Sequence, residues 1–521
     1  MMKIQLWLIS ISLCMSISFL SAEEGSWFPE ILKKDSKAYI PDYSFAGYQW
    51  GEKELPKLKP TMKLTDFGAV PNDGKDDTEA FQKALQSAMK TKGTVVLSLP
   101  PGKLILNDIL YIERSDFVLQ GAGNGKGGTT IYIPRSLEKM NLPASFHKKK
   151  EYLIKNKKYV KGKLFSLFSW SAGVIWTRIP KGHPRSLEKA KIVSGKRGGN
   201  EIVLDNFSKF KKGDVALIHW HNTEGKNGSL LKHVLGDDKL KIGPRLYENP
   251  TKPLFSQPIT IAKVNKNKIT IVEKLLHDLR PEWGNILKGT NYLERVGIEN
   301  IRIEFPQTKY AGHHLEEGYN GLYLTGLMHS WVRNVTIHNT DAAILSGACK
   351  NTTYDGIEVT GRPGHYSVHM GGCYGMVCKN FKFESGAIHD PSFNSHAKLC
   401  VYTNGKIRIA HLDQHCALNH QNLFDKIRVE DGSQLFKHGG AKYWYPTAGL
   451  FNTFWNIQIE KGDKLSCSNA PGAIIVGLTG GKNDLNIKYG PSPTVEGTNK
   501  HNISVPSLYE YQLKQRLKLL K

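Results

Sequence analysis

The sequence predicts an all-β fold, a single parallel β-helix with an N-terminal capping helix and an inserted β-rich lobe. Short segments of Asn, Gly or Lys followed by apolar-x-apolar recur through the C-terminal half. They begin at Asn300, Asn334, Gly356, Asn380, Lys406, Lys426, Asn456 and Asn486. From one first apolar residue to the next, the steps are 34, 22, 24, 26, 20, 30 and 30 residues. This spacing is typical of a β-solenoid, in which each coil adds a strand to a stack.

The chain begins with a pattern typical of a secretory signal. Residues 1–22 hold one lysine, an apolar run from Ile4 to Leu20, and small residues before Glu23. We therefore expect a cleaved signal over 1–22 and a secreted or periplasmic protein. No later apolar run is long enough to cross a bilayer, so we expect no membrane insertion.

The next two segments are predicted to be an N-terminal extension over 23–60 and the start of the β-helix over 61–134. The extension is aromatic and contains proline but shows no clean period, and we expect it to lie over the domain. After the turn residues Asn72-Asp73-Gly74, Asp76 can cap a helix with Glu79 three residues on. The strand Val95–Leu99 follows and ends at a Pro-Gly turn.

These residues carry a family resemblance. Asp66 to Leu85 followed by Val95 to Gly102 resembles the opening of the pectin-lyase-like, right-handed parallel β-helix proteins, where a helix caps the first coils. Together with the repeat, the resemblance covers the opening and most of 296–490. It implies a right-handed β-helix whose side cleft binds a polysaccharide, in a superfamily dominated by polysaccharide lyases and glycoside hydrolases.

The remaining segments follow from where the repeat is kept and where it is broken. Residues 135–295 interrupt it, and strands at 211–218 and 269–272 predict an inserted β-rich lobe. Residues 296–490 form the main coils, which we expect to hold the active-site cleft. Residues 491–521 are predicted to be a C-terminal cap, with a short basic helix from Ser507 covering the open edge of the last coil.

Charge and cysteine content narrow the class of partner. The net charge of +24 suits a polyanion, and for an exported protein that is an acidic polysaccharide rather than nucleic acid. A solvated lysine surface without a partner is the alternative. Six cysteines follow the signal, and they are either disulfide-bonded or buried as thiols. We expect a monomer.

The histidines are concentrated in one quarter of the chain. Twelve of the 19 lie between His313 and His438. Counting eight residues from Ile357, Phe381 and Ile407 gives the residues His365, His389 and His415. If the coils stack in register, these rings form a column at a spacing of ~4.8 Å. Such a column is either a catalytic surface or a structural ladder.

Cleavage of a uronate polymer by β-elimination needs a base, an acid and a group that neutralises the carboxylate. His389 or His415 is the candidate base, and Asp413 is placed to hydrogen-bond His415 and raise its basicity. Tyr402 is the candidate acid. The candidate substrate-binding residues are Arg408, Arg428, Lys437, His438, Tyr443 and Trp444, which combine positive charge with faces for stacking on sugars.

A hydrolase would instead need two carboxylic acids flanking the scissile bond. Asn339-Thr340-Asp341 matches the first element of the β-helical polygalacturonase pattern, and Gly364-His365-Tyr366 is similar to its Gly-His-Gly. The Asp-Asp pair of that pattern is missing, and Lys406-Ile407-Arg408 reverses its last element. Asp341, Asp390 and Asp413 leave another hydrolase arrangement open.

We therefore expect a secreted enzyme that cuts an acidic, uronate-containing polysaccharide, with or without sulfate, as a polysaccharide lyase. The alternatives are a glycoside hydrolase on the same scaffold and a non-catalytic polysaccharide-binding β-helix. No motif requires a cofactor, and without CxxC or HExxH we expect no structural zinc site. Ca²⁺ is compatible with the fold, because its ligands can come from different coils.

Overall fold

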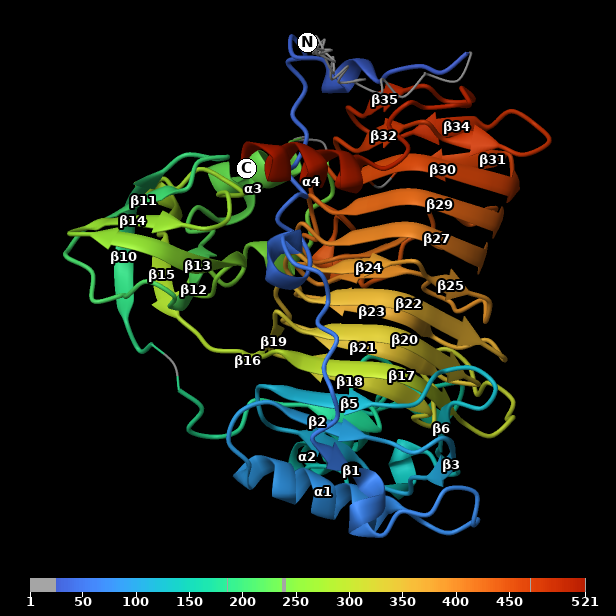
Figure 1. The fold of residues 1–521 in the computed structure, drawn as a ribbon. Coiled ribbons are helices and arrows are strands. Elements are labelled where there is room, and N and C mark those ends of the chain that lie inside the picture. Colours follow the sequence, from blue (N-terminus) through green and yellow to red (C-terminus); the bar gives the residue numbers. More distant parts are fainter. Residues whose placement is uncertain (1–24, 185, 237–239, 469, 521) are drawn as a thin grey trace, which may run out of the picture.

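The computed structural model describes residues 25–184, 186–236, 240–468 and 470–520. The expected signal over 1–22 lies outside the described residues. The described chain is an upright parallel β-helix with a barrel at its side (Figure 1). The predicted fold class is confirmed.

The larger face of the solenoid is a sheet of 16 strands. Its strands are β1 (Met62–Lys63), β2 (Val95–Ser98), β3 (Gly102–Ile105), β5 (Phe117–Gln120), β6 (Thr129–Tyr132), β17 (Val296–Glu304), β20 (Trp331–His338), β22 (Thr353–Thr360), β24 (Val377–Lys379), β25 (Lys382–Phe383), β27 (Val401–Ile409), β29 (Leu423–Asp431), β30 (Thr453–Lys461), β32 (Ile474–Val476), β33 (Thr479–Gly480) and β35 (Thr494–Glu496). All their pairings are parallel, because neighbouring strands come from successive coils that run in the same direction. Some coils contribute two short strands, such as β24 and β25, which both pair with β22.

A second parallel sheet of seven strands forms another face. Its strands are β4 (Leu110–Ile112), β9 (Ile175–Thr177), β18 (Asn320–Thr325), β21 (Ala342–Gly347), β23 (Tyr366–Gly371), β26 (Ser392–Asn394) and β28 (Asp413–His415). Two further pairs complete the coils, β16 (Leu293–Glu294) with β19 (Leu327–Met328) and β31 (Lys464–Cys467) with β34 (Asn486–Tyr489). A short hairpin joins β7 (Tyr159–Val160) to β8 (Lys163–Leu164).

A column of left-handed residues bends the long strands of the larger sheet. Asn300, Asn334, Asn380 and Asn404 all have φ between 51° and 58°, which asparagine tolerates better than most residues. Their side chains also bond from coil to coil, at 3.1 Å from Asn334 Nδ2 to Asn300 Oδ1 and 2.6 Å from Asn404 Nδ2 to Asn380 Oδ1. These left-handed residues form the corner of each coil, and the apolar-x-apolar repeat seen in the sequence is the strand segment that directly follows each corner.

Two of the eight predicted segments are out of register with the sheet. Phe383 pairs with Ile407, so the fifth corner is Asn404 and its first apolar position holds Gly405, two residues before the predicted one. A Cβ at Gly405 would lie 2.0 Å from the Phe381 ring, which fills that position instead. The segment at Asn486 pairs only with β31, outside the main sheet.

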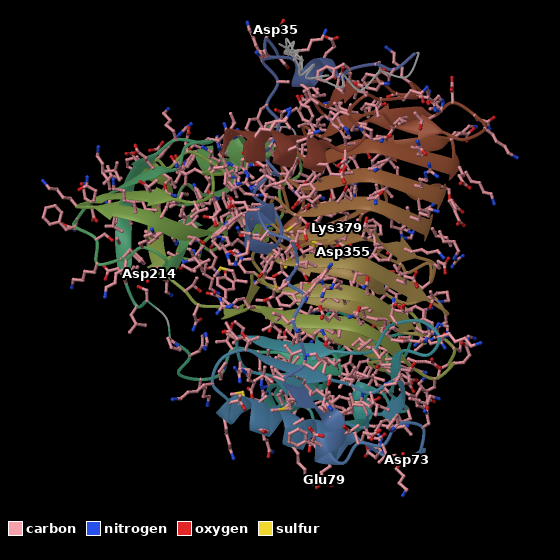
Figure 2. The ribbon with its side chains drawn as sticks, viewed as in Figure 1. Asp35, Asp73, Glu79, Asp214, Asp355 and Lys379 are labelled. Carbon is pink, nitrogen blue, oxygen red and sulfur yellow. The ribbon has the colours of Figure 1, made fainter. Side chains whose placement is uncertain are left out.

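The solenoid interior carries an aromatic stack in addition to aliphatic layers. Tyr402 and Phe424 lie with ring centroids 5.8 Å apart, and Phe424 and Phe454 lie 5.4 Å apart. Facing pairs of this kind contribute about 0.5–1.5 kcal/mol beyond their buried area. On the outside, Lys379 Nζ lies 3.3 Å from Asp355 Oδ2, and Figure 2 shows this pair at mid-height of the sheet.

Helices close the first coils. The helix α1 (Thr78–Lys90) lies under them and buries Phe81 and three alanines (Figure 1). At its start, Asp76 Oδ1 accepts a hydrogen bond from the Thr78 amide at 3.0 Å. The helix α2 (Ala144–Lys155) buries Phe146 and Leu153 near the second sheet.

The lobe is a closed six-stranded barrel inserted between β9 and β16. It consists of β10 (Lys189–Gly195), β11 (Glu201–Leu204), β12 (Val215–Trp220), β13 (Phe255–Asn265), β14 (Lys268–Ile271) and β15 (Ile286–Gly289), with α3 (Ser229–Leu235) packed on it. The barrel is therefore shorter than the predicted 135–295, since β9 belongs to the second sheet of the solenoid.

Buried polar groups join the barrel to the solenoid. His420 Nε2, from the solenoid, lies 2.8 Å from His277 Nε2, and His277 Nδ1 lies 3.1 Å from His233 Nε2 in α3. Lys350 and Glu273 form a fully buried ion pair across the same junction. Because unpaired buried charges are costly, this pair fixes how the two parts meet.

Residues 25–61 form a strap along the solenoid. Trp27 forms an isolated β-bridge with Ile503 beside the last coils. Further along, the Tyr43 hydroxyl donates a hydrogen bond to Thr453 Oγ1 at 2.9 Å, and the Gly47 amide donates one to the Gly375 carbonyl at 2.8 Å. The strap ends at β1 (Figure 1). The extension therefore lies over the domain, as the sequence suggested.

The C-terminal helix does not cover the edge of the last coil. The helix α4 (Leu508–Leu519) lies across the flank, where the Ser507 hydroxyl and the Leu508 amide donate to Asp425 of β29. Arg516 contacts Glu52 of the strap at 2.6 Å. The expectation of an edge cap was wrong because the flank offers α4 a buried carboxylate and the strap.

The sequence left open whether the cysteines form disulfides or are buried as thiols, and it predicted no membrane insertion. The six cysteines in the described chain are buried free thiols. In the described part of the chain, no helix has the length and apolar character needed to span a membrane.

Candidate active site

A pocket of about 670 Å³ opens over the second sheet. Strands β23, β26 and β28 provide its floor, and the loops around residues 165–170, 313–314 and 439–444 form its walls. It is lined by the histidines His313, His314, His369, His389 and His415, and by the aromatic residues Phe165, Trp170, Tyr366, Tyr443 and Trp444. No Asp or Glu is among the described residues that line it.

Behind the pocket, Asp413 holds two of these histidines. Asp413 Oδ2 lies 3.1 Å from His415 Nδ1 and 3.2 Å from His389 Nδ1. Asp413 also accepts from the Ser392 hydroxyl and the Gly439 amide, each at 2.7 Å. Burial favours its neutral form, but the two imidazoles hold the pKa of Asp413 well below its ordinary value. With Nδ1 facing a carboxylate, Nε2 of His415 is left as the basic nitrogen.

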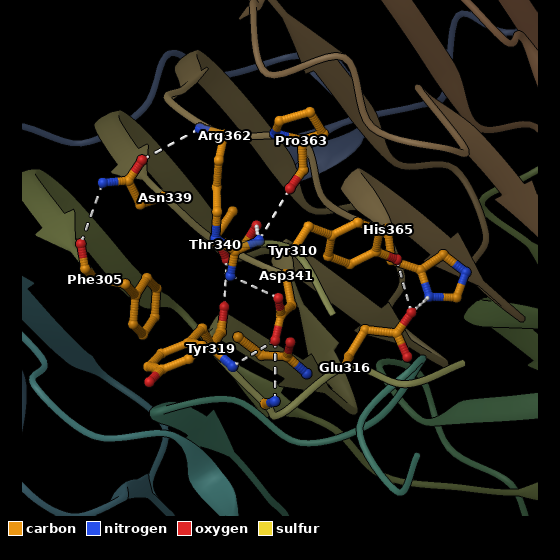
Figure 3. A network of polar contacts seen from close by, with 12 residues as sticks. Phe305, Tyr310, Glu316, Tyr319, Asn339, Thr340, Asp341, Arg362, Pro363 and His365 are labelled. Carbon is orange, nitrogen blue, oxygen red and sulfur yellow. Dashed lines mark hydrogen bonds and ion pairs between the residues drawn. The ribbon is translucent and has the colours of Figure 1, made fainter. Parts of the chain in front are cut away.

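Glu316 supports a third histidine in the same way (Figure 3). Its Oε1 lies 2.9 Å from His365 Nδ1, and it accepts from the Tyr310 hydroxyl at 2.9 Å and the Ser169 hydroxyl at 2.7 Å. Burial raises the pKa of Glu316, but the hydrogen bond and charge of His365 with the Ser169 hydroxyl outweigh it and lower the pKa to about 2. Burial lowers the pKa of His365 to about 4.

The loop that carries Glu316 is fixed by a buried ion pair (Figure 3). Arg362 Nη2 donates to Asp341 Oδ1 at 2.7 Å, and Asp341 Oδ2 accepts from the amides of Gly318 and Tyr319 at 3.0 and 2.9 Å. Asp341 is buried and is not among the residues that line the pocket, so its role is to position the loop.

The three predicted histidines meet as a cluster rather than as an in-register column. Ring centroids lie 5.2 Å apart for His365 and His389, and 4.8 Å apart for His389 and His415. In the sheet, however, His389 pairs with Tyr366, and His415 pairs with Asn394. The rings converge because the coils differ in length, so residues at different strand positions in successive coils meet at the same place on the sheet.

Residues 61–165, about a fifth of the chain, match the family described as "Rhamnogalacturonase A/epimerase, pectate lyase-like". The first coils of the chain are therefore similar to those of the pectate-lyase-like β-helix proteins. The resemblance seen in the opening motif is therefore confirmed.

The chain also resembles proteins of bacteria and phages. Over 79 residues it is 37% identical to the putative phage-related protein YobO of Bacillus subtilis (strain 168), a match that spans 15% of this chain and 9% of that protein. The tailspike gp61 of Pseudomonas phage phi297 aligns with 85% of this chain and 76% of its own, at a TM-score of 0.44 and 10% identity. The Gp54 tailspike of Acinetobacter baumannii bacteriophage AP22, in complex with a capsular saccharide, aligns over 84% and 69% at a TM-score of 0.41 and 11% identity.

A row of aromatic side chains runs along the second sheet of the solenoid. Tyr111, Trp176 and Tyr323 occupy the same position of successive strands, the position that His369 takes two coils further on. Trp176 and Tyr323 border a second hollow of about 450 Å³ together with Lys149 and Arg178. Lys149 Nζ lies 5.6 Å from the centroid of Trp170, which also lines the histidine pocket, so the two hollows adjoin.

Of the predicted catalytic residues, His389 and His415 line the pocket, Asp413 lies behind them, and His365 is buried beneath them. Tyr402 was wrongly assigned as the acid. Its side chain points into the core, and its hydroxyl donates to the carbonyls of Val368 and Ser392 at 3.0 and 3.2 Å. Asp390 is also fully buried, against the Ser367 hydroxyl at 2.9 Å.

Among the predicted substrate-binding residues, Tyr443 and Trp444 line the pocket. The other four do not line it. Arg408 donates to the Ser385 carbonyl at 2.9 Å, Arg428 is exposed on β29 of the larger sheet, and Lys437 borders a separate hollow. His438 follows Lys437 outside the lining, and burial lowers its pKa to about 4.

Four residues of the site were not singled out from the sequence. They are His313, His314, Glu316 and His369. The first three stand within four residues of one another in the histidine-rich quarter, and that density was the available signal.

Proposed function

We propose that this protein is a secreted polysaccharide lyase that cleaves a uronate-containing polymer by β-elimination. The observation that supports it is a pocket whose acid–base groups are imidazoles and phenols, with carboxylates only behind them. A lyase base can be an imidazole, whereas a hydrolase needs two carboxyl groups at the scissile bond.

His415 is the proposed base. Its side chain is 22% exposed, against 8% for His389, and its Nδ1 lies 3.1 Å from Asp413. Asp413 therefore orients the ring, fixes the tautomer with a free Nε2, and stabilises the imidazolium that forms. Nε2 removes the C5 proton of the uronate.

Tyr366 takes the acid role that the sequence suggested for Tyr402. Its side chain is 1% exposed, but its ring is part of the pocket lining, with its centroid 5.2 Å from that of His389 and 6.5 Å from that of His415. Burial raises its pKa well above the ordinary value, so the phenol keeps its proton until a strong base forms beside it. As the C4–O bond breaks and the C4–C5 double bond forms, the leaving oxygen takes this proton, and proton exchange from His415 restores the phenol.

The surroundings suit an anionic chain of sugars. Tyr443 and Trp444 at the pocket and Trp176 and Tyr323 along the sheet offer faces for pyranose rings. Lys149 lies between them and has no carboxylate partner among the described residues, so its charge is free for a uronate. Such pairing would also explain part of the excess of 24 positive charges.

A hydrolase acting through Asp390 and Asp413 is not favoured. Both carboxyl groups are 0% exposed and engaged with hydroxyl groups. Neither can flank a scissile bond without rebuilding the floor of the pocket.

The test is incubation of the purified protein with a panel of uronate polymers, following ultraviolet absorbance and new reducing ends in parallel. We expect both to rise, because elimination gives one unsaturated uronate for each cut. New reducing ends without a rise in absorbance would indicate hydrolysis. No change in either measurement on any polymer would favour the non-catalytic binding protein.

Variants locate the chemistry. We expect His415→Gln to lower kcat about 10²–10⁴-fold, the usual contribution of general base catalysis. His338→Gln is the matched control, because His338 hydrogen-bonds Thr360 at 2.8 Å on the larger sheet. Equal activity in both variants would remove His415 from the mechanism.

A further inference from the structure

Beside His415, three other histidines converge from separate segments. His313 lies in the loop after β17, and His365 and His389 lie just before β23 and β26. Their ring centroids are 4.7 Å apart for His313 and His365, 5.6 Å for His313 and His389, and 5.2 Å for His365 and His389. One nitrogen from each ring lies within 4.8 Å of the other two.

Carboxylates behind two of these rings face their Nδ1 atoms and orient the rings. His365 Nδ1 lies 2.9 Å from Glu316, and His389 Nδ1 lies 3.2 Å from Asp413. Nε2 of each ring is buried and has no hydrogen-bond partner among the described residues. A buried imidazole nitrogen without a partner is costly, and a carboxylate on Nδ1 with Nε2 open is the usual arrangement around a metal-bound histidine.

We propose that His313, His365 and His389 bind a divalent transition-metal ion of the zinc class, with an open coordination position toward the pocket. Three imidazoles with a free fourth position form the ligand set of catalytic zinc sites, whereas Ca²⁺ prefers oxygen. His313 is exposed and His365 is buried, so the ion would lie at the boundary between the pocket and its floor.

Two neighbouring groups of ligand type are less suitable. In the trio His389, Asp413 and His415, the carboxylate already accepts from Ser392 and Gly439. In the trio His314, Glu316 and His365, the carboxylate already accepts from Tyr310 and Ser169. Binding an ion there would replace existing hydrogen bonds, whereas the three-histidine group offers open nitrogens.

The role of the ion rests on the proposed lyase function. A lyase must neutralise the uronate carboxylate, and none of the described residues lining the histidine pocket is Arg or Lys. The His389 ring lies 4.8 Å from that of His415, so an ion on His389 would hold the carboxylate beside the base. It would thereby stabilise the enolate-like intermediate.

The test is Co²⁺ binding to the full-length mature protein after chelation, without polysaccharide. We expect about one Co²⁺ per chain by elemental analysis, with visible bands typical of four- or five-coordinate cobalt. His313→Gln should weaken binding at least about tenfold without unfolding the protein, because His313 is exposed. His338→Gln and His415→Gln should bind Co²⁺ as the wild type does.

Each contrary result has a distinct meaning. Unchanged binding in His313→Gln, or equal loss in His415→Gln, would overturn this ligand set. Absence of Co²⁺ binding with lyase activity intact after chelation would overturn the site and leave the lyase. Co²⁺ binding that depends on His313, without activity on any polymer, would leave the site and overturn the lyase.

Discussion

Acid should loosen the junction between the barrel and the solenoid. His420 and His277 are buried there with their Nε2 atoms 2.8 Å apart, and Lys398 and Arg197 lie close enough to repel a proton. Burial and these charges lower the pKa of His420 from 6.5 to about 3, and that of His277 well below its ordinary value. Both rings are therefore neutral in the folded protein at neutral pH.

The sign of the effect follows from proton binding. The unfolded chain takes up a proton on each histidine as the pH falls below 6.5, while folded His420 takes one up only near pH 3. Stability is therefore full above about pH 6.5 and is lost progressively as the pH falls toward 3. For His420 alone, the loss at about pH 5 is about 2 kcal/mol, the free energy of protonating the unfolded ring.

The assay is urea unfolding at about pH 7.5 and about pH 5, comparing wild type with His420→Gln. Glutamine does not titrate, so the drop in unfolding free energy between the two pH values should shrink by about 2 kcal/mol. His501→Gln, at an exposed position, should leave the drop unchanged. If His420→Gln shows the full wild-type drop, the buried ring does not couple stability to pH and the reasoning fails.

Three further substitutions test the core and the site. Gly405→Ala should destabilise the protein by about 1–3 kcal/mol in urea unfolding, since its Cβ would meet the Phe381 ring, and Phe381→Leu in the same chain should restore most of the loss. Tyr402→Phe should cost about 1 kcal/mol while leaving kcat unchanged, and a large fall in kcat would return Tyr402 to the mechanism. Trp176→Ala should raise KM several-fold on long polymers with little change in kcat, and unchanged KM would place the substrate elsewhere.

The fold could be predicted because its signal is local and repeated. Each coil places an αL residue before an apolar-x-apolar strand, and asparagine marks many of these corners. The predicted position of a segment was wrong where packing between coils replaced this local pattern. At Gly405 the apolar side chain comes from Phe381 one coil earlier, so the segment appeared two residues late.

That register error explains why Tyr402 was misplaced. In the sheet, Tyr402 pairs with Cys378 and Phe424, whose side chains point into the core. With the segment predicted to begin at Lys406, Tyr402 falls before it and its place inside the strand β27 is missed. Arg408 and Arg428 lie on the strand faces of the larger sheet, away from the pocket over the smaller one.

The site itself could be predicted only in part. Asp413 and His415 are only two residues apart in the sequence, and the predicted contact between them is present in the structure. The contact between Glu316 and His365 spans 49 positions and depends on a loop held by Arg362 and Asp341. Nothing local in the sequence specifies such a long-range contact.

The strap has a consequence for the order in which the protein can form. Trp27 exchanges backbone hydrogen bonds with Asn502 and Ser504, which are made long after it. Early coils can stack as they emerge, but the segment around Trp27 cannot settle until residues 502–504 have been synthesised and folded. The strap is therefore among the last parts of the described chain to reach its final position.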